Sequence, residues 1–161
     1  MAVDMFLKIN GVDGESKDDK HKKQIDVLAW SWGMSNSGSA HVGGGAGAGK
    51  VNVQDLSVTK WVDSASPKLV LACCAGDHYD EATLFVRKAG GSNPVEYIKI
   101  KMQEVFISSV STGGSGGEDR LTEHVVLNFA KFNLDYTPQD EKGAGGTAIP
   151  AGWDIAANKK N

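Results

Sequence analysis

Short segments of alternating apolar and polar residues recur along the chain, and this period of two is typical of β-strands with one buried and one solvated face. Met5, Leu7 and Ile9, for example, alternate with Lys8. The pattern predicts strands at residues 4–10, 25–34, 51–59, 82–89, 95–102, 105–111, 121–136 and 149–155. Within 121–136 the apolar positions switch register, which indicates a bulge or bend of the kind found where a sheet closes into a barrel.

The segment 25–34 has two unlike faces. The bulky face is predicted to point into the core, and its residues are Leu28, Trp30, Trp32 and Met34. The opposite face consists of Ile25, Val27, Ala29, Ser31 and Gly33. At Ser31 and Gly33 this second face presents little more than backbone and a hydroxyl, so we expect it to look onto a polar space or a close neighbour.

Residues 68–75 form the one predicted helix. Ser66 is placed to cap its first amide groups, and Pro67 suits the first helical position because proline has no N–H to leave unpaired. Gly76 suits the left-handed residue that ends a helix. The chain is therefore predicted to be mainly β with one short helix.

The composition indicates one domain of 161 residues without a strongly charged surface. The net charge is −3, and the one dense basic cluster, Lys17–Lys23, contains two aspartates and is interpreted as a solvated turn. The first residues lack the basic and apolar parts of a secretory signal, and no stretch approaches membrane-spanning length. We expect a protein made in the cytoplasm that binds neither nucleic acid nor membrane.

Candidate chemical motifs fail on inspection. Gly44–Lys50 has the spacing of a phosphate-binding loop, but Val51 stands where a hydroxyl should reach magnesium, and a strand follows where the motif needs a helix. The four histidines lack the spacing of metal ligands, and His78 beside two carboxylates is interpreted as part of a solvated turn. We expect no catalytic residues, no cofactor and no metal.

Two adjacent cysteines, Cys73 and Cys74, lie within the predicted helix. Neighbouring cysteines pair only through a strained ring, so a stabilising disulfide between them is not expected. We interpret both as reduced, small, buried apolar residues.

Residues 35–49 are rich in Gly, Ser and Ala. Such a segment cannot bury enough surface to order itself, so it is predicted to be a long loop that becomes ordered when a partner holds it. A loop of this length indicates a binding role.

Five segments carry a family resemblance: residues 1–6, 30–35, 49–56, 87–91 and, most specifically, 108–123, which reads SSVSTGGSGGEDRLTE. Over essentially the whole chain the sequence resembles the Hcp family of type VI secretion tube proteins. It departs from the family pattern at Lys17–Lys23, at the Cys73–Cys74 pair, and from Pro138 onward except around Gly152–Trp153.

The resemblance implies a fold and an assembly. The fold would be a closed β-barrel formed by two sheets with one short α-helix at the side. Homohexameric rings would stack head-to-tail into a tube, and a contractile sheath would drive the tube and its small effectors out of a Gram-negative bacterium without a signal peptide, as a virulence device. The implied partners are further copies of the chain, the spike protein VgrG, sheath and baseplate proteins, and effectors.

The resemblance also gives two parts of the chain a role. Ser31 and Gly33 are candidate lumen residues that touch effectors, because a strand face of small residues suits a hydrated channel that must release its cargo. The alternative is that Ser31 packs under a neighbouring strand. Contact with a neighbouring subunit or ring is expected for His41, Val42, Gly43, Gly44, Gly45 and Lys50.

Two other functions remain open at this point. The first is a monomeric ligand-binding or enzymatic β-barrel in which the glycine-rich loops act as lids over an internal pocket. The second is a chaperone or receptor for effectors, with a related chain building the tube. The oligomeric state separates the first from a tube subunit, because a tube subunit must form rings.

Overall fold

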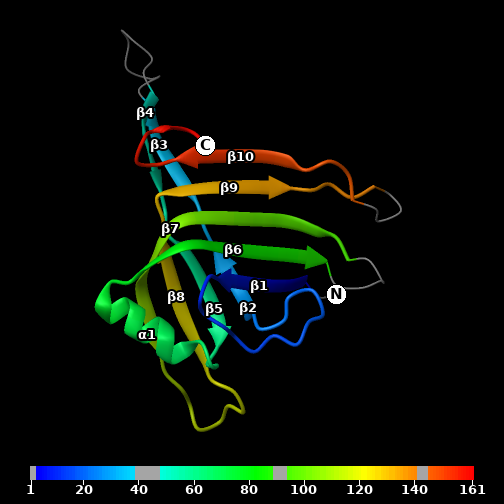
Figure 1. The fold of residues 1–161 in the computed structure, drawn as a ribbon, viewed down its shortest axis with the longest axis vertical. Helices are drawn as coiled ribbons and strands as arrows, with labels where there is room; N and C mark the ends of the chain where they lie inside the picture. Colours follow the sequence, from blue (N-terminus) through cyan, green and yellow to red (C-terminus); the bar gives the residue numbers. More distant parts are fainter. Residues whose placement is uncertain (1–2, 39–47, 89–93, 141–144) are drawn as a thin grey trace.

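A computed structural model describes residues 3–38, 48–88, 94–140 and 145–161. Over these ranges the chain forms one helix and eleven strands (Figure 1). In chain order they are β1 (Val3–Ile9), β2 (Ile25–Ser31), β3 (Met34–Gly38), β4 (Ala48–Val53), β5 (Leu56–Trp61), α1 (Ser66–Ala75), β6 (His78–Lys88), β7 (Glu96–Thr112), β8 (Thr122–Asn128), β9 (Lys131–Tyr136), β10 (Ile149–Asp154) and β11 (Lys159–Lys160).

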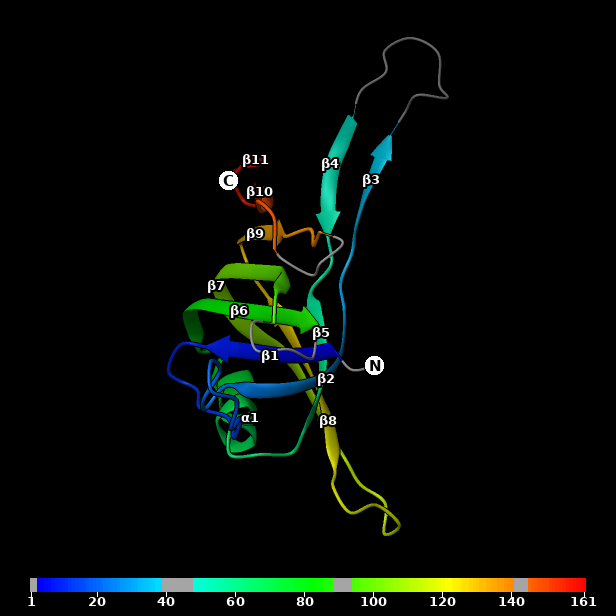
Figure 2. The same ribbon diagram turned by 90° about the vertical axis from the view of Figure 1, so that its right-hand side faces the viewer.

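Six strands close into a barrel in the order β6-β1-β2-β5-β8-β7, because β7 pairs with both β8 and β6. Strands β9, β10 and β11 extend the sheet outward from the first half of β7, and β3 and β4 form a separate two-stranded hairpin. The mainly β fold with a closed barrel and one short helix is therefore confirmed. The hairpin projects from one end of the molecule, and the turn between β7 and β8 projects from the opposite end (Figure 2).

The closure of the barrel depends on a bend in the middle of β7. The sequence predicted two strands, 95–102 and 105–111, but the structure has one strand of 17 residues. Glu104 at its middle has a φ of 55°, a left-handed conformation that turns the strand. The first half pairs with β9 and the second half with β8, so the predicted strand 121–136 breaks at the same level, between Asn128 and Lys131. The bend predicted within 121–136 is confirmed.

In the segment 25–34, the side chains before Leu28 point to the side opposite to the predicted one, because the strand has a bulge at Leu28. Val27 pairs with Lys60 and Ala29 pairs with Thr59, so Leu28 has no opposite residue and the strand changes face. Before the bulge, Ile25 and Val27 point into the core, at 0% and 6% exposure. The prediction that their face is the polar one was therefore wrong for these two residues.

After the bulge the predicted faces hold in part. Trp30 and Trp32 pack against the core, as expected. Leu28 and Met34 do not, since they are 37% and 47% exposed. The predicted strand also ends early, because β2 stops at Ser31 and β3 begins at Met34.

The helix α1 begins two residues before its predicted start. Pro67 lies in its first turn and Gly76 ends it with a φ of 69°, as predicted. Ser66 is not the cap, because Ala65 holds that position without a side-chain bond. The helix packs on the barrel beside β7 through its buried residues Leu69 and Ala72.

The cysteines of α1 depart from their expected environment. Both are free, which agrees with the absence of a strained ring, but Cys73 is only half-buried and Cys74 is exposed. The prediction of two buried residues was wrong because Cys74 points to the side of α1 that carries Pro67, Val70 and Leu71.

Ser66 instead belongs to a charged cluster buried beneath the start of α1. Lys60 is fully buried, and its Nζ contacts the Glu123 carboxylate and lies 2.9 Å from Asp63 Oδ1 and 3.2 Å from Ser66 Oγ. The Ser66 hydroxyl donates to Glu123 and accepts from the Asp63 N–H. These contacts join β5, β8 and the helix, and they compensate the cost of burying three charges.

Removal of one partner from this cluster should be costly. Glu123→Ala leaves the buried Lys60 ammonium with one carboxylate, Asp63, and the Ser66 hydroxyl, so we expect the free energy of unfolding to fall by about 3 kcal/mol. Urea denaturation at fixed protein concentration measures it, because assembly adds to stability. Glu118→Ala in the exposed turn is the control and should change stability by less than about 0.5 kcal/mol. Equal stabilities for the two variants would contradict the importance of the cluster.

Candidate functional site

The strands β2, β5, β8 and the second half of β7 present one side to the core and the other to the exterior. On the exterior side, two rows of paired residues cross the four strands: Ser31, Ser57, Val126 and Ser109 in the first, and Ala29, Thr59, His124 and Ser111 in the second. We name these eight residues the small-residue face. Five of the eight side chains carry a hydroxyl group, four Ser and one Thr, and none of the eight is Asp, Glu, Lys or Arg.

Ser31 is exposed at the edge of the small-residue face. It pairs in register with Ser57, and its exposure does not support the alternative that it packs under a neighbouring strand. Within the second row, His124 is exposed and its Nδ1 lies 3.0 Å from Thr59 Oγ1. His124 is the one titratable side chain among the eight, and sequence reasoning gave it no role.

The other predicted site residues lie elsewhere or outside the described chain. Gly33 lies between β2 and β3, and its carbonyl accepts from the Gln54 N–H at 2.9 Å. A Cβ at this position would come within 3.3 Å of Gln54 Oε1, so the glycine permits a close approach. Lys50 lies exposed on β4. The predicted contact residues His41, Val42, Gly43, Gly44 and Gly45 fall outside the described residues.

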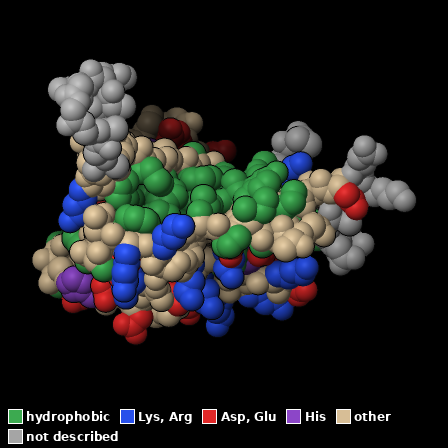
Figure 3. All heavy atoms as spheres, turned by 90° about the horizontal axis from the view of Figure 1, so that it is seen from above, with side chains coloured by type: hydrophobic (Ala, Val, Ile, Leu, Met, Phe, Trp, Pro, Cys, Tyr) green, Lys and Arg blue, Asp and Glu red, His purple; other side chains and the backbone are tan. Residues whose placement is uncertain are grey.

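An apolar groove lies between the β3–β4 hairpin and the β9–β10 pair. It encloses about 380 Å³ and is lined by Met34, Asn36, Val51, Val53, Phe132, Leu134, Ala151, Gly152 and Trp153. Figure 3 looks onto this end of the molecule and shows hydrophobic side chains gathered in one continuous patch. Sequence reasoning missed the groove because its walls come from four strands that are far apart in the chain.

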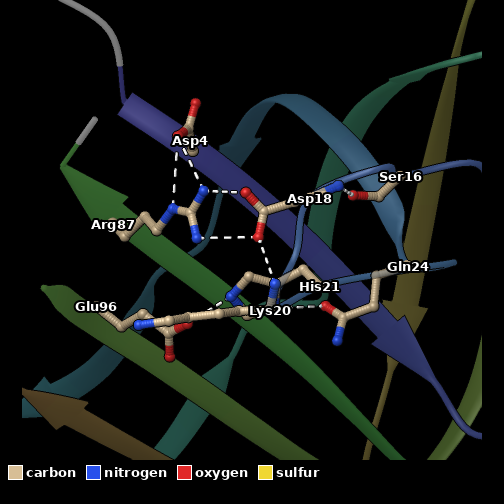
Figure 4. Close-up of polar contacts among 8 residues, drawn as sticks. All are labelled: Asp4, Ser16, Asp18, Lys20, His21, Gln24, Arg87 and Glu96. Carbon is tan, nitrogen blue, oxygen red and sulfur yellow. Dashed lines mark hydrogen bonds and ion pairs between the residues drawn. The ribbon is translucent and has the colours of Figure 1, made fainter. Parts of the chain in front are cut away.

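The outer side of β1, β6 and the first half of β7 is charged, in contrast to the small-residue face. Residues 10–24 cross it and are held there by ionic contacts (Figure 4). Arg87 donates to both oxygens of Asp18, with Nη1 3.1 Å from Oδ1, and to Asp4 Oδ2 at 3.3 Å. The hydrogen bond from Arg87 lowers the pKa of the Asp18 carboxyl, against an opposing effect of burial.

His21 also holds residues 10–24 in place, through a buried side chain. His21 is buried, with 3% of the residue exposed, and its ring stacks on Phe6 with ring centroids 4.4 Å apart. Its Nδ1 lies 3.0 Å from Gln24 Oε1, and its Nε2 contacts the Glu96 carboxylate. The prediction that Lys17–Lys23 is a solvated turn was therefore correct for the lysine side chains but wrong for His21, which covers the apolar ring of Phe6.

Other chemical features are few. Across the described ranges, no group of three His, Cys, Asp or Glu side chains is placed to hold a metal ion. The same part of the chain contains no helix whose length and apolar character would suffice to cross a bilayer. After Lys50 the chain continues in β4, so the helix that a phosphate-binding loop requires does not follow.

The ionic attachment of residues 10–24 predicts a defined pH dependence. The folded-state pKa of Asp18 is lowered below 3.8, so its stabilising contribution is present above that value and is lost as the pH falls through the lowered folded-state pKa. At pH 7 we expect Asp18→Asn to reduce the free energy of unfolding by about 0.5–1 kcal/mol, because solvent screens this ion pair, and the difference from the unmodified chain to vanish in acid. Denaturation at several pH values measures it. Asp19→Asn, at an exposed position beside it, should have almost no effect at any pH, and equal behaviour of the two variants would refute the prediction.

Comparison with known proteins identifies the family. Residues 6–136 match the family model described as "Type VI secretion system effector, Hcp". The chain is 63% identical over 159 residues to protein hcp1 of Pseudomonas aeruginosa, which covers 98% of each chain. A structure titled as a type six secretion system protein has a TM-score of 0.93 at 37% identity, covering 99% of this chain and all of the other. Hcp1 from Salmonella typhimurium has a TM-score of 0.81 at 39% identity, with full coverage of both chains. The chain therefore belongs to the Hcp family of type VI secretion system proteins.

Proposed function

We propose that this chain is the subunit of a homohexameric ring, and that such rings stack head-to-tail into a tube exported by the type VI secretion system. The lumen of the tube binds and carries small effector proteins. The observation that carries the proposal is the small-residue face, together with membership of the Hcp family. A ring of barrels has an inner wall, and this side of the barrel has the chemistry that an inner wall needs.

The chemistry follows from what a channel for cargo must do. Charged walls would hold oppositely charged cargo strongly and repel the rest, whereas hydroxyl groups and small apolar groups form weak contacts with many polypeptides. Ser31 lies exposed on this face. We assign it to the lumen, with Gly33 as a neighbour that keeps the backbone close to Gln54. The charged side that carries residues 10–24 would then face away from the lumen.

The β3–β4 hairpin suits contact between copies of the chain. It projects beyond the barrel (Figure 2), and all five residues of β3 are exposed. A projecting hairpin without cover of its own is a natural contact element for a second copy. We assign subunit or ring contact to the segment that it carries, residues 41–45, and to Lys50 on β4.

The remaining parts of the proposal rest on membership of the Hcp family. The chain is made in the cytoplasm and performs no catalysis. Its partners besides itself are the spike protein VgrG, the contractile sheath and baseplate proteins, and effectors. The monomeric ligand-binding barrel is disfavoured because buried apolar side chains fill the barrel interior, among them Leu7, Ile25, Leu56, Leu84, Ile100 and Leu127.

The oligomeric state tests the proposal first. We expect light scattering of the purified chain to give a mass of about 102 kDa, six times the 17.0 kDa of one chain, or multiples of that mass where rings stack. The reason is that an exposed hairpin and an open apolar groove are costly to leave in water. A single-chain mass at every concentration would exclude the ring and favour the monomeric barrel.

The assignment of Ser31 is tested by cargo retention. Ser31→Gln adds bulk and a flexible amide at six equivalent positions of each ring, so we expect co-purified effector to fall by roughly tenfold, which corresponds to about 1.4 kcal/mol. Ser64→Gln is the matched control, because Ser64 is exposed but lies outside the small-residue face, and it should retain effector normally. Light scattering should show intact rings for both variants. Unchanged retention in Ser31→Gln would remove this residue from the site.

A further inference from the structure

One side chain of the small-residue face can change its charge near neutral pH. His124 lies on β8, in register with Thr59 on β5 and with Ser111 on β7. It is exposed, and the other seven residues of the face are Ser, Thr, Ala or Val. Imidazole is the side chain that ordinarily gains or loses its proton between about pH 5 and pH 8. The face is therefore uncharged when this ring is neutral and positive when it is protonated.

The contact with Thr59 positions the His124 ring in both protonation states. Its Nδ1 lies 3.0 Å from Thr59 Oγ1. A hydroxyl donates to an unprotonated ring nitrogen and accepts from a protonated one, so the hydrogen bond survives a change of charge. The other ring nitrogen, Nε2, has no hydrogen-bond partner among the described residues. It is left to contact a molecule that lies against the face.

The strands beside His124 direct their own charges away from the face. Lys60 on β5 and Glu123 on β8 point into the core, where they contact each other. Asp55, just before β5, accepts hydrogen bonds from Ser108 Oγ at 2.9 Å and from Asn128 Nδ2 at 2.8 Å. Within the two rows of the face, a protonated imidazole therefore meets no opposite charge.

Ionisable groups of the β7–β8 turn approach His124 from one end of the face. Glu118 lines the same hollow as His124, which encloses about 330 Å³, and Asp119 is exposed in the same turn. Burial raises the pKa of the Asp26 carboxyl on β2, against the opposing attraction of Arg120. A proton taken up by Asp26 changes the net charge in the same direction as one taken up by His124, so variants of both residues are needed to separate the two effects.

We propose that His124 makes the lumen selective for acidic effector segments when the pH falls below about 6, and leaves it without a charge preference near pH 8. The inference rests on the proposed tube and adds a specificity-determining residue to its wall. The proposed ring carries six copies of His124, so protonation places six positive charges around one enclosed channel, where charges of one sign reinforce each other. Effector segments with exposed carboxylates are then held more tightly, and basic segments are held less tightly.

The binding of two matched peptides measures this selectivity. The first is a fluorescent peptide rich in Glu, and the second has Gln in place of every Glu. For rings of the unmodified chain we expect the affinity for the Glu peptide to rise roughly tenfold between about pH 8 and about pH 5.5, and the affinity for the Gln peptide to stay within about twofold. Fluorescence anisotropy measures both affinities at the same ionic strength, and light scattering at both pH values shows whether the rings are intact.

Four variants assign the effect to one residue. His124→Gln keeps a hydrogen-bonding side chain without a titrating proton, so it should bind the Gln peptide normally and lose the rise for the Glu peptide. His124→Lys carries a fixed charge and should bind the Glu peptide tightly at both pH values. His78→Gln removes an exposed histidine outside the small-residue face, and Asp26→Asn removes the second candidate for proton uptake. Both of these control variants should keep the rise.

Several results would overturn the inference. A rise of equal size in His124→Gln, or its loss in His78→Gln or Asp26→Asn, would assign the proton to another group. An equal rise for the Gln peptide would show that acid exposes the face without selecting charge. Unmodified rings that show no rise, or that come apart at the lower pH, would show that this lumen has no such selectivity. In all these cases rings form near pH 8 and the proposed function stands, whereas an unmodified chain that is monomeric at every pH would refute the proposed function itself.

Discussion

The bend shared by β7 and the β8–β9 segment is the constraint on which the rest of the structure depends. A strand offers two edges, and β7 uses one of them for β6 and the other first for β9 and then for β8. Because the strand turns at Glu104, its two halves belong to sheets of different direction, and the barrel closes without an open edge between β7 and β6. The bend thereby creates two outer sides with different neighbours, one covered by residues 10–24 and one left bare as the small-residue face.

The alternation of apolar and polar residues was enough to predict the class of fold, but it did not predict for every side chain whether it points into the core or to the exterior. Alternation identifies strands reliably, yet a single unpaired residue such as Leu28 reverses the two faces of β2, and nothing in the sequence marks its position. The strand break predicted near 103–104 failed for a related reason. Gln103 and Glu104 separate the two predicted strands, and the chain does turn at Glu104, but pairing with β6 continues on both sides of the turn, so the two segments form one bent strand.

Buried polar groups were the least predictable part. Lys60 alternates with Val58 and Leu56, so it faces the core, and its burial becomes tolerable only because Glu123 and Asp63 arrive from distant parts of the chain. His21 depends in the same way on Phe6 and Glu96. Long-range pairing of this kind leaves no local pattern. Ser31 could be proposed from one strand because the two faces of that strand differ in bulk, but His124 and the apolar groove require four strands to be placed first.

Three kinds of surface divide the exterior of this chain, and the division favours assembly over chemistry. A free-standing ligand-binding protein concentrates its polar groups in a concave pocket. Here the apolar groove is concave, the small-residue face is an open sheet, and charged side chains line the outer side of β1, β6 and β7, where some of them hold residues 10–24. Each surface is incomplete in one copy. An open apolar groove is costly to leave in water and an uncharged wall suits an enclosed space, so both surfaces favour assembly of identical chains.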